Sequence, residues 1–265
     1  MFFLATFVLV LIIYSKTLHW VVGSWIFNPY YTHGFLVLSV SLYLGYKKSK
    51  KIKYGKESSI GILLIAVALI VHTIATIFEF HFISAMTIPF AIFGIVASFY
   101  GLNVAKEFLF PVFFILLAVP YPIYAISNVL EVLSANVSVS ILKFFGFDVF
   151  NVGAEIHLNN YMFVVGAPCS GIRSVLALLT VSVLYTYIIK DDFLIKFILI
   201  CISIPLAVFA NILRITAILV TADVFSKDIA LNVVHYFSDV IFFAIAVALL
   251  IVIRRCLNWM LNLFS

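Results

Sequence analysis

The stretch Lys47-Lys48-Ser49-Lys50-Lys51-Ile52-Lys53, followed by Lys56, decides the topology of this chain. It carries six lysines against a single nearby acid, Glu57, and apolar runs long enough to cross a membrane lie on both sides of it. Loops that flank membrane spans and are rich in lysine and arginine stay in the cytoplasm. The stretch therefore predicts a cytoplasmic loop, and it fixes the direction of every span before and after it.

The composition of the whole chain is that of an integral membrane protein. Of the 265 residues, 65% are hydrophobic and only 10% are charged, and the mean hydropathy is +1.25, whereas soluble domains are about 25% charged. Because the apolar runs are long rather than short and alternating, we expect helical spans and no outer-membrane barrel. The lysine loop accounts for the net charge of +5, so the expected partner is the lipid bilayer and not a nucleic acid.

We predict about eight transmembrane helices, with both termini in the cytoplasm. The first apolar run has no basic leader and no Ala-x-Ala cleavage site, so we interpret it as a retained span and not as a signal peptide. Eleven of the sixteen basic residues fall on the cytoplasmic side in this count. The predicted spans are 2–22, a short one ending near 46, 59–78, 82–100, 108–119, 170–189, 195–219 and 233–253.

The segment 121–168 lies outside the cytoplasm in this count, within what we expect to be a single integral membrane domain over residues 1–265. In its first half, apolar residues recur every three or four positions, which predicts an amphipathic helix on the outer membrane interface. Its second half, 148–165, is rich in β-branched and aromatic residues around Asn159-Asn160, which predicts a small β-hairpin. The fold class is therefore an all-α polytopic membrane protein with these two extracytoplasmic elements. The residues of the helical stripe are Ile126, Leu130, Leu133, Val137, Ile141 and Phe144.

The stretch Gly166-Ala167-Pro168-Cys169-Ser170-Gly171-Ile172-Arg173 joins that segment to the sixth span. A cysteine on the first turn of a helix is favoured as a thiolate, because the exposed N–H groups and the helix dipole stabilise negative charge there. Arg173 adds a cation one turn later. Taken alone, Cys169 could equally be a small buried residue at a helix start. Cys201 and Cys256 lie at other predicted depths, so we expect no disulfide framework.

Two further spans bring unusual polar residues to the same outer layer of the membrane. Arg214 lies roughly twenty residues into the seventh span, about 30 Å from its cytoplasmic end, and His235 opens the eighth span. A charged residue inside a span is costly, so it is a functional candidate by default. Singly, Arg214 could be a snorkelling anchor and His235 an interfacial histidine. Their coincidence with Cys169 at one depth favours a functional site.

The three side chains are those of a cysteine acyl-transfer site. A histidine can take the thiol proton and later protonate a leaving amine, and an arginine can bind the oxyanion of a tetrahedral intermediate or a carboxylate. Asn211, one turn before Arg214, could share that duty. Asp239, one turn after His235, could orient the imidazole, and Arg173 could lower the pKa of the thiol or bind substrate. This chemistry calls for no cofactor and no metal.

Taken together, these residues resemble the exosortase/archaeosortase family of membrane cysteine transpeptidases. The likeness covers most of the chain and implies a catalytic triad of Cys169, Arg214 and His235, with Ser170 and Gly171 in the cysteine motif. His33 is then interpreted as structural or substrate-positioning. The motifs that carry the likeness are Trp25 with Asn28-Pro29-Tyr30-Tyr31-Thr32-His33-Gly34-Phe35, Pro111 with Pro120-Tyr121-Pro122, Gly146-Phe147 with Gly153 and Ile156, Cys169-Ser170-Gly171-Ile172-Arg173, Ala210-Asn211-Ile212-Leu213-Arg214-Ile215, and His235.

The resemblance also implies a substrate and a location. It implies cleavage of the C-terminal sorting signals of secreted proteins (a short motif, a transmembrane helix and a basic cluster) at the outer face of the cell membrane. The protein would then pass to a surface acceptor, a lipid or a glycan. The alternative is a non-enzymatic transporter or an assembly scaffold for surface polymers, which predicts polar groups near mid-membrane and internal repeats. The chain has no His-Glu-x-x-His motif of a metalloprotease and no evident Gly-x-Ser-x-Gly serine.

Overall fold

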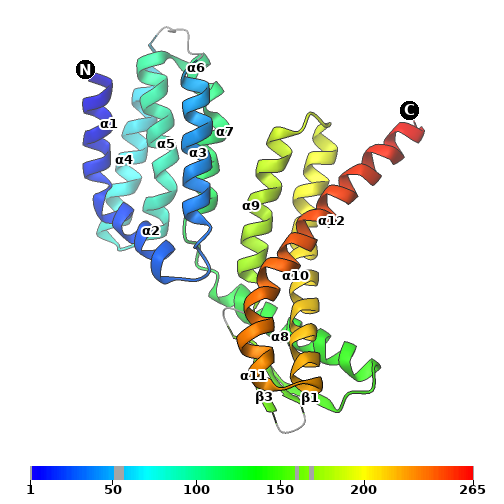
Figure 1. Cartoon of the computed structure of the whole chain (residues 1–265). Helices are drawn as coiled ribbons and strands as arrows, with labels where there is room; N and C mark the ends of the chain where they lie inside the picture. The colour runs from blue at the N-terminus through cyan, green and yellow to red at the C-terminus, as the bar shows by residue number, and fades with distance from the viewer. Residues whose placement is uncertain (1, 51–56, 159–160, 167–169, 265) are drawn as a thin grey trace. The chain divides into compact units, whose positions relative to one another are not determined.

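The computed structural model describes residues 2–50, 57–158, 161–166 and 170–264, and it is about 80% helical. The chain divides into two compact units, Met1–Pro122 and Ile123–Ser265, and each is described here by itself (Figure 1). The expectation of one membrane domain over residues 1–265 stays a prediction.

The first unit is a bundle of helices in which α4 and α5 pack along each other. At the start of the unit α1 and α2 are bent by 67° relative to each other, at a break next to Tyr14. The elements are α1 (Phe2–Ile13), α2 (Ser15–Phe27), α3 (Gly34–Ser49), α4 (Ser59–Ile77), α5 (His81–Tyr100), α6 (Leu102–Glu107), α7 (Leu109–Phe114) and a 3₁₀ helix, η1 (Ile115–Ala118).

A buried polar cluster lies beside the break between α1 and α2. The Ser84 hydroxyl is 2.6 Å from the Thr17 hydroxyl and 2.7 Å from Nδ1 of His72. The Tyr14 hydroxyl is 2.6 Å from that of Thr87. Because lipid offers no hydrogen bonds, polar groups at this depth need protein partners. The cluster therefore fixes the bend against α4 and α5.

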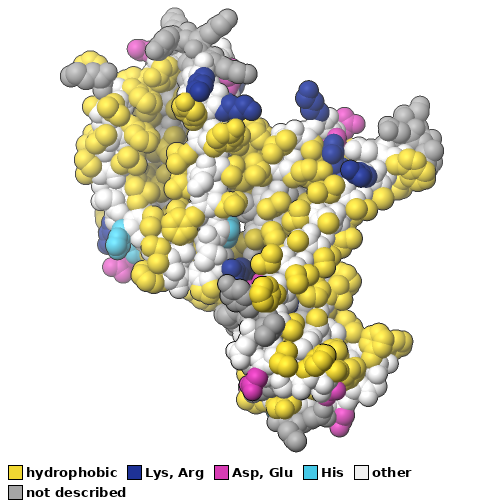
Figure 2. Space-filling model, viewed as in Figure 1, with side chains coloured by type: hydrophobic (Ala, Val, Ile, Leu, Met, Phe, Trp, Pro, Cys, Tyr) yellow, Lys and Arg dark blue, Asp and Glu magenta, His cyan; other side chains and the backbone are white. Residues whose placement is uncertain are grey.

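The second unit packs α9, α10 and α12 against one another, with α8 lying against α10 (Figure 1). A wide turn of π-helix, η3, comes directly before α12. Lysine and arginine side chains gather at the end of this unit where α9 turns into α10 (Figure 2). The elements are α8 (Tyr124–Phe144), β1 (Val149–Val152), β2 (Glu155–Leu158), β3 (Tyr161–Val164), α9 (Ile172–Ile188), α10 (Phe193–Val224), α11 (Lys227–Ile229), η3 (Ala230–Val234) and α12 (His235–Phe264).

Helix α8 occupies the place of the predicted amphipathic helix, and its buried face mixes serines with the apolar side chains of Ala135, Val139 and Leu142. Ser138 donates a hydrogen bond to the Ile212 carbonyl of α10. Part of the predicted apolar stripe is exposed, including Ile126, Leu133 and Phe144. Small residues let helices approach closely, and apolar side chains are stable on a surface that faces lipid. The buried serines are Ser127, Ser134 and Ser138.

A three-stranded antiparallel sheet, in the order β1-β2-β3, stands where a two-stranded hairpin was predicted. The stretch is long enough to fold back twice. Gly153, with φ of +61°, makes the first turn, and the pairing of Leu158 with Tyr161 leaves only two residues for the second. One face of the sheet packs against α8 and α10 through Val149, Ile156, Leu158, Phe163 and Val165.

The polytopic helical class is confirmed, but the eight predicted spans are not. Among the described residues, four helices are long and apolar enough to cross a membrane, or five if the bent pair of α1 and α2 is one span. Helix α9 and the run Leu109–Ala118 are apolar but shorter. The 17 residues of α9 rise about 25 Å, less than the ~30 Å hydrocarbon core. The four single-helix spans are Ser59–Ile77, His81–Tyr100, Phe193–Val224 and Phe237–Met260.

Candidate functional site

Six of the predicted site residues can be located in unit 2. Cys169 lies outside the described residues, and for His235 only the backbone is described, as the first residue of α12. The predicted meeting of these two with Arg214 therefore stays a prediction. The residues whose surroundings are described are Ser170, Gly171, Arg173, Asn211, Arg214 and Asp239.

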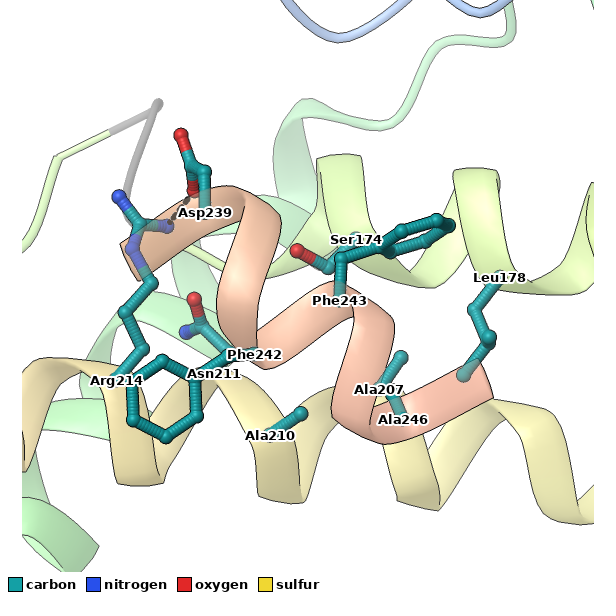
Figure 3. Close-up of a pocket in the computed structure, with 10 residues that line it drawn as sticks. All are labelled: Ser174, Leu178, Ala207, Ala210, Asn211, Arg214, Asp239, Phe242, Phe243 and Ala246. Carbon is teal, nitrogen blue, oxygen red and sulfur yellow. Dashed lines mark ion pairs between the residues drawn. The ribbon is translucent and has the colours of Figure 1, made fainter. Parts of the chain in front are cut away.

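Arg214 is the central described residue, and it contacts Ser238 and Asp239 of α12. Its side chain is 3% exposed, its Nη1 lies 2.7 Å from Oδ1 of Asp239, and its Nε donates to the Ser238 hydroxyl at 3.3 Å (Figure 3). A buried guanidinium needs a carboxylate and hydrogen-bond acceptors to offset its lost hydration. The pair therefore sets α10 against the first turns of α12.

Asp239 is shared between two arginines. Its Oδ2 lies 3.9 Å from Nη1 of Arg173, at the start of α9. The side chains of Arg173 and Asp239 are 45% and 36% exposed, so this contact is the weaker of the two. Asp239 was predicted to orient the imidazole of His235, and in the structure its carboxylate contacts the guanidinium groups of Arg173 and Arg214. Whether it also orients His235 stays a prediction.

The start of α9 packs on α10 one turn before Arg214. Gly171 has a φ of +82°, and a Cβ there would lie 2.9 Å from Cγ of Asn211. Both the left-handed backbone and the close approach therefore require glycine. Asn211 is buried and donates to the Ser134 hydroxyl of α8 at 3.3 Å, while the buried Ser170 hydroxyl accepts the Ile172 N–H at 3.4 Å. These residues hold α8, α9 and α10 together, a role that the sequence analysis did not assign to them.

A narrow pocket opens between α9, α10 and α12 (Figure 3). One end is polar and the remainder is lined mostly by apolar side chains. A fixed cation beside apolar walls can hold a carboxylate or a carbonyl oxygen that gains negative charge. The lining residues are Ser174, Leu178, Ala207, Ala210, Asn211, Arg214, Asp239, Phe242, Phe243 and Ala246.

His33 belongs to unit 1, where it caps the end of a helix. Its Nε2 is 3.0 Å from the Leu117 carbonyl, and Nε1 of Trp25 donates to the Ala118 carbonyl at 2.7 Å. The Tyr31 hydroxyl donates to the Tyr121 carbonyl. The last carbonyls of a helix have no partner within it, so these side chains supply partners at and just beyond the end of η1. The interpretation of His33 as a structural or substrate-positioning residue stays a prediction.

A second arginine–aspartate pair closes the opposite end of α9. Arg254 donates to Asp191 through Nε, at 2.5 Å, and Nη2, at 2.8 Å. Tyr185 and Asn258 complete the group, at 3.2 Å from Arg254 and 3.3 Å from Asp191. The hydrogen bonds from Arg254 lower the pKa of the Asp191 carboxyl below its ordinary value. Both residues follow the cytoplasmic ends of predicted spans, 170–189 and 233–253, but their pairing was not predicted.

No group of three or more His, Cys, Asp and Glu side chains in the described part of the chain is placed to hold a metal ion. A family model described as transmembrane exosortase matches residues 25–252. The match includes the Trp25 motif, the described site and most of α12. Comparison with curated proteins and with solved structures gives no significant match.

Proposed function

Because this chain belongs to the transmembrane exosortase family, we propose that it is a cysteine transpeptidase that cleaves C-terminal sorting signals of secreted proteins. It is a multi-pass membrane protein, and family membership supports a membrane transpeptidase role in general. We place the cleavage at the outer face of the cell membrane. The released protein passes to a lipid or glycan acceptor on the surface.

One observation carries this proposal: a buried, permanently charged guanidinium stands at a pocket beside the start of α9. Gly171 packs against Asn211, one turn from Arg214. Cys169 precedes Gly171 by only two residues, and two residues of chain extend at most about 7 Å. A nucleophile on this motif is therefore tethered close to the one buried cation of the described pocket.

The proposed reaction uses three side chains. The Cys169 sulfur bonds to the carbonyl carbon of the scissile peptide bond while His235 takes the thiol proton. Arg214 stabilises the oxyanion, and as the C–N bond breaks the leaving amine takes the proton from His235. The acceptor's nucleophilic group then loses its proton to His235 and attacks the thioester, and the departing thiolate takes that proton back.

The buried polar cluster of unit 1 bears on the alternative of a transporter. A transport site is expected near the bilayer midplane. His72 lies in the last third of α4 and Ser84 in the first turn of α5, so the cluster lies towards the joined ends of these helices. Its members bond to one another across α2, α4 and α5. This arrangement favours a structural role and leaves the transpeptidase as the better-supported function.

The test is to co-express the chain with a secreted protein that carries a motif, a transmembrane helix and a basic cluster at its C-terminus. We expect the wild-type chain to shorten this protein at the motif, as measured by mass spectrometry, and the Cys169→Ala variant to leave it full length. Cys201→Ala and Cys256→Ala are matched controls, because both cysteines are exposed, and they should process normally. Wild-type processing by a folded Cys169→Ala chain would show that Cys169 is not the nucleophile.

A further inference from the structure

The two edges of the sheet in unit 2 are treated differently by the fold. Helix α8 packs against β1, and Nδ2 of Asn151 on β1 donates to Oδ1 of Asn136 on α8 at 2.7 Å. In the described part of the chain, β1 and β3 each pair only with β2, so the packing of α8 is what distinguishes the β1 edge from the β3 edge. The edge formed by β3 is therefore the open one.

The hydrogen-bond phase shows which backbone groups face the open edge. The Val165 N–H donates to the Ala154 carbonyl at 2.9 Å, so this pair is of the hydrogen-bonded type. Such pairs alternate along an antiparallel ladder. Residues 161, 163 and 165 therefore bond to β2, and the N–H and C=O groups of Met162 and Val164 point away from it.

The open edge is short, with four residues, but it lacks the other usual protections of edge strands. Proteins blunt such edges with charged residues, proline, bulges or a covering element, whereas β3 reads Tyr161-Met162-Phe163-Val164. The Met162 and Val164 side chains are 51% and 57% exposed. Figure 2 shows hydrophobic side chains over the end of unit 2 where β1 and β3 lie, with acidic side chains among them.

We propose that the open edge of β3 binds an extended segment of the protein substrate as a fourth strand. This inference rests on the proposed function and assigns its peptide-binding element. An extended peptide repeats its N–H and C=O groups every two residues, as Met162 and Val164 do, and strand addition of this kind is a general mode of peptide recognition. The side chains of Met162 and Val164 would be the direct neighbours of the added strand on this face, so apolar side chains are expected at alternate positions of the bound segment.

The position of β3 in the chain gives the reason for choosing a substrate as the occupant. Cys169 follows Val164 by five residues, which extend at most about 17 Å. A bound strand lies about 4.8 Å from β3, and each further residue of an extended peptide advances by about 3.3 Å. A scissile bond three to five residues beyond the paired segment lies roughly 10–17 Å along an extended peptide, which matches the greatest reach of the chain from Val164 to Cys169.

Disulfide trapping tests the geometry directly. The background carries Cys169→Ala, Cys201→Ser and Cys256→Ser, so that the tail is not consumed, and Val164→Cys is added. Single cysteines are placed at consecutive positions of the co-expressed tail protein, before its motif. We expect cross-links at every second position, because paired side chains on one face lie about 5 Å apart. Val152→Cys, exposed on the same face at the covered edge, is the matched control and should give none.

Two outcomes of the trapping experiment would overturn the proposal. One is the absence of a two-residue period, or equal trapping from Val152→Cys. The other is a Val164→Cys cross-link between two copies of this chain in place of one to the tail protein, which would make the edge a self-association site. This arm uses an inactive chain, so its result does not depend on whether wild-type protein cleaves the tail.

Processing assays test the same edge in the active chain. Met162→Pro removes an N–H from the open edge and leaves the ladder to β2 intact, and proline is tolerated at such edge positions. We expect processing to fall at least about tenfold, mainly through KM, whereas Met162→Ala keeps the N–H and should lose less than about threefold. Equal processing by the two folded variants would refute the inference, while failure of the wild-type chain to process any tail would count against the proposed function instead. If Met162→Pro does not fold, the trapping result decides.

Discussion

The two arginine–aspartate pairs of unit 2 stand at opposite ends of α9, about 25 Å apart along its 17 residues, and they differ in construction. Arg254 donates two hydrogen bonds to Asp191. It donates a third to Tyr185, and Asn258 donates one to Asp191. Arg214 makes a single 2.7 Å contact with Asp239, whose other oxygen faces Arg173 at 3.9 Å. In the first pair, which we call the clamp, both carboxylate oxygens of Asp191 accept hydrogen bonds from Arg254. In the second pair, the carboxylate of Asp239 is shared between two cations.

This difference suggests different tasks. Bidentate arginine–carboxylate pairs hold two elements in a fixed relation. At the shared pair, Arg173 and Asp239 are both partly exposed. A substrate oxygen atom can therefore compete with Asp239 for the guanidinium group of an arginine while the helices stay packed. Variants of each arginine should therefore separate activity from stability.

Arg214→Gln is expected to have the largest effect, on activity. Loss of one donor to a developing oxyanion lowers turnover by about 10²–10³-fold, while Asp239 keeps Arg173 as a partner. The measurement is the rate of tail processing per folded molecule, with size-exclusion chromatography as the folding check. A folded Arg214→Gln chain with near-normal turnover would remove the shared pair from the mechanism.

Arg254→Gln is expected to act on stability instead. Losing a charge-assisted pair at the edge of the bundle costs about 1–2 kcal/mol of unfolding free energy, which lowers the thermal midpoint by a few degrees. Processing per folded molecule should not change. Thermal unfolding in detergent measures the first effect, and a drop in turnover at unchanged stability would reverse the assignment of the two clusters.

The clamp should also weaken in acid. Hydrogen bonds from Arg254 lower the pKa of Asp191 below its ordinary value of 3.8. A carboxyl group with a lowered folded-state pKa stabilises the protein fully above its unfolded-state pKa, and this stabilisation is lost as the pH falls through the folded-state value. The difference in the free energy of unfolding between wild type and Asp191→Asn should be constant from about pH 7 to pH 5 and should shrink below pH 4. A difference that does not depend on pH would show that the charge of Asp191 is not involved.

Arg173→Gln is expected to have the smallest effect. Its contact with Asp239 is long and exposed, and such pairs contribute at most about 1 kcal/mol, which corresponds to less than about fivefold in turnover. The comparison variant is Arg214→Gln, measured in the same processing assay. An equal loss in the two variants would mean that Arg173 contacts substrate or the thiol more directly than the ion pair with Asp239 suggests.

The class of the protein and most of its helices follow from the sequence, because long apolar runs and a lysine-rich loop depend only on local residues. Contacts between distant elements did not follow. Opposite charges at Arg214 and Asp239 do not reveal that they pair, since pairing depends on the relative rotation of α10 and α12. The third strand was missed because Gly153 was not interpreted as a turn in addition to the one at Asn159-Asn160.

The apolar stripe of α8 does not show which of its residues contact α10. Around a membrane protein such a stripe is stable on the side that faces lipid, so the contacts within the protein have to be found in the structure. Ser134 and Ser138, which bond to α10, mark the inward face. The candidate site was predicted in part, since Arg214 and its helix contacts are described, and the placement of Cys169 and the His235 side chain stays a prediction.

The wide turn at Ala230–Val234 determines the direction in which each later side chain of α12 points around the helix axis. A π-helical turn holds about one more residue than an α-helical turn, and each residue of an α-helix rotates the next by about 100°. Shortening that turn by one residue would therefore carry Asp239, Phe242 and Ala246 round the axis together, away from Arg214 and out of the cavity wall. The length of this turn thus governs whether the two charges meet at all.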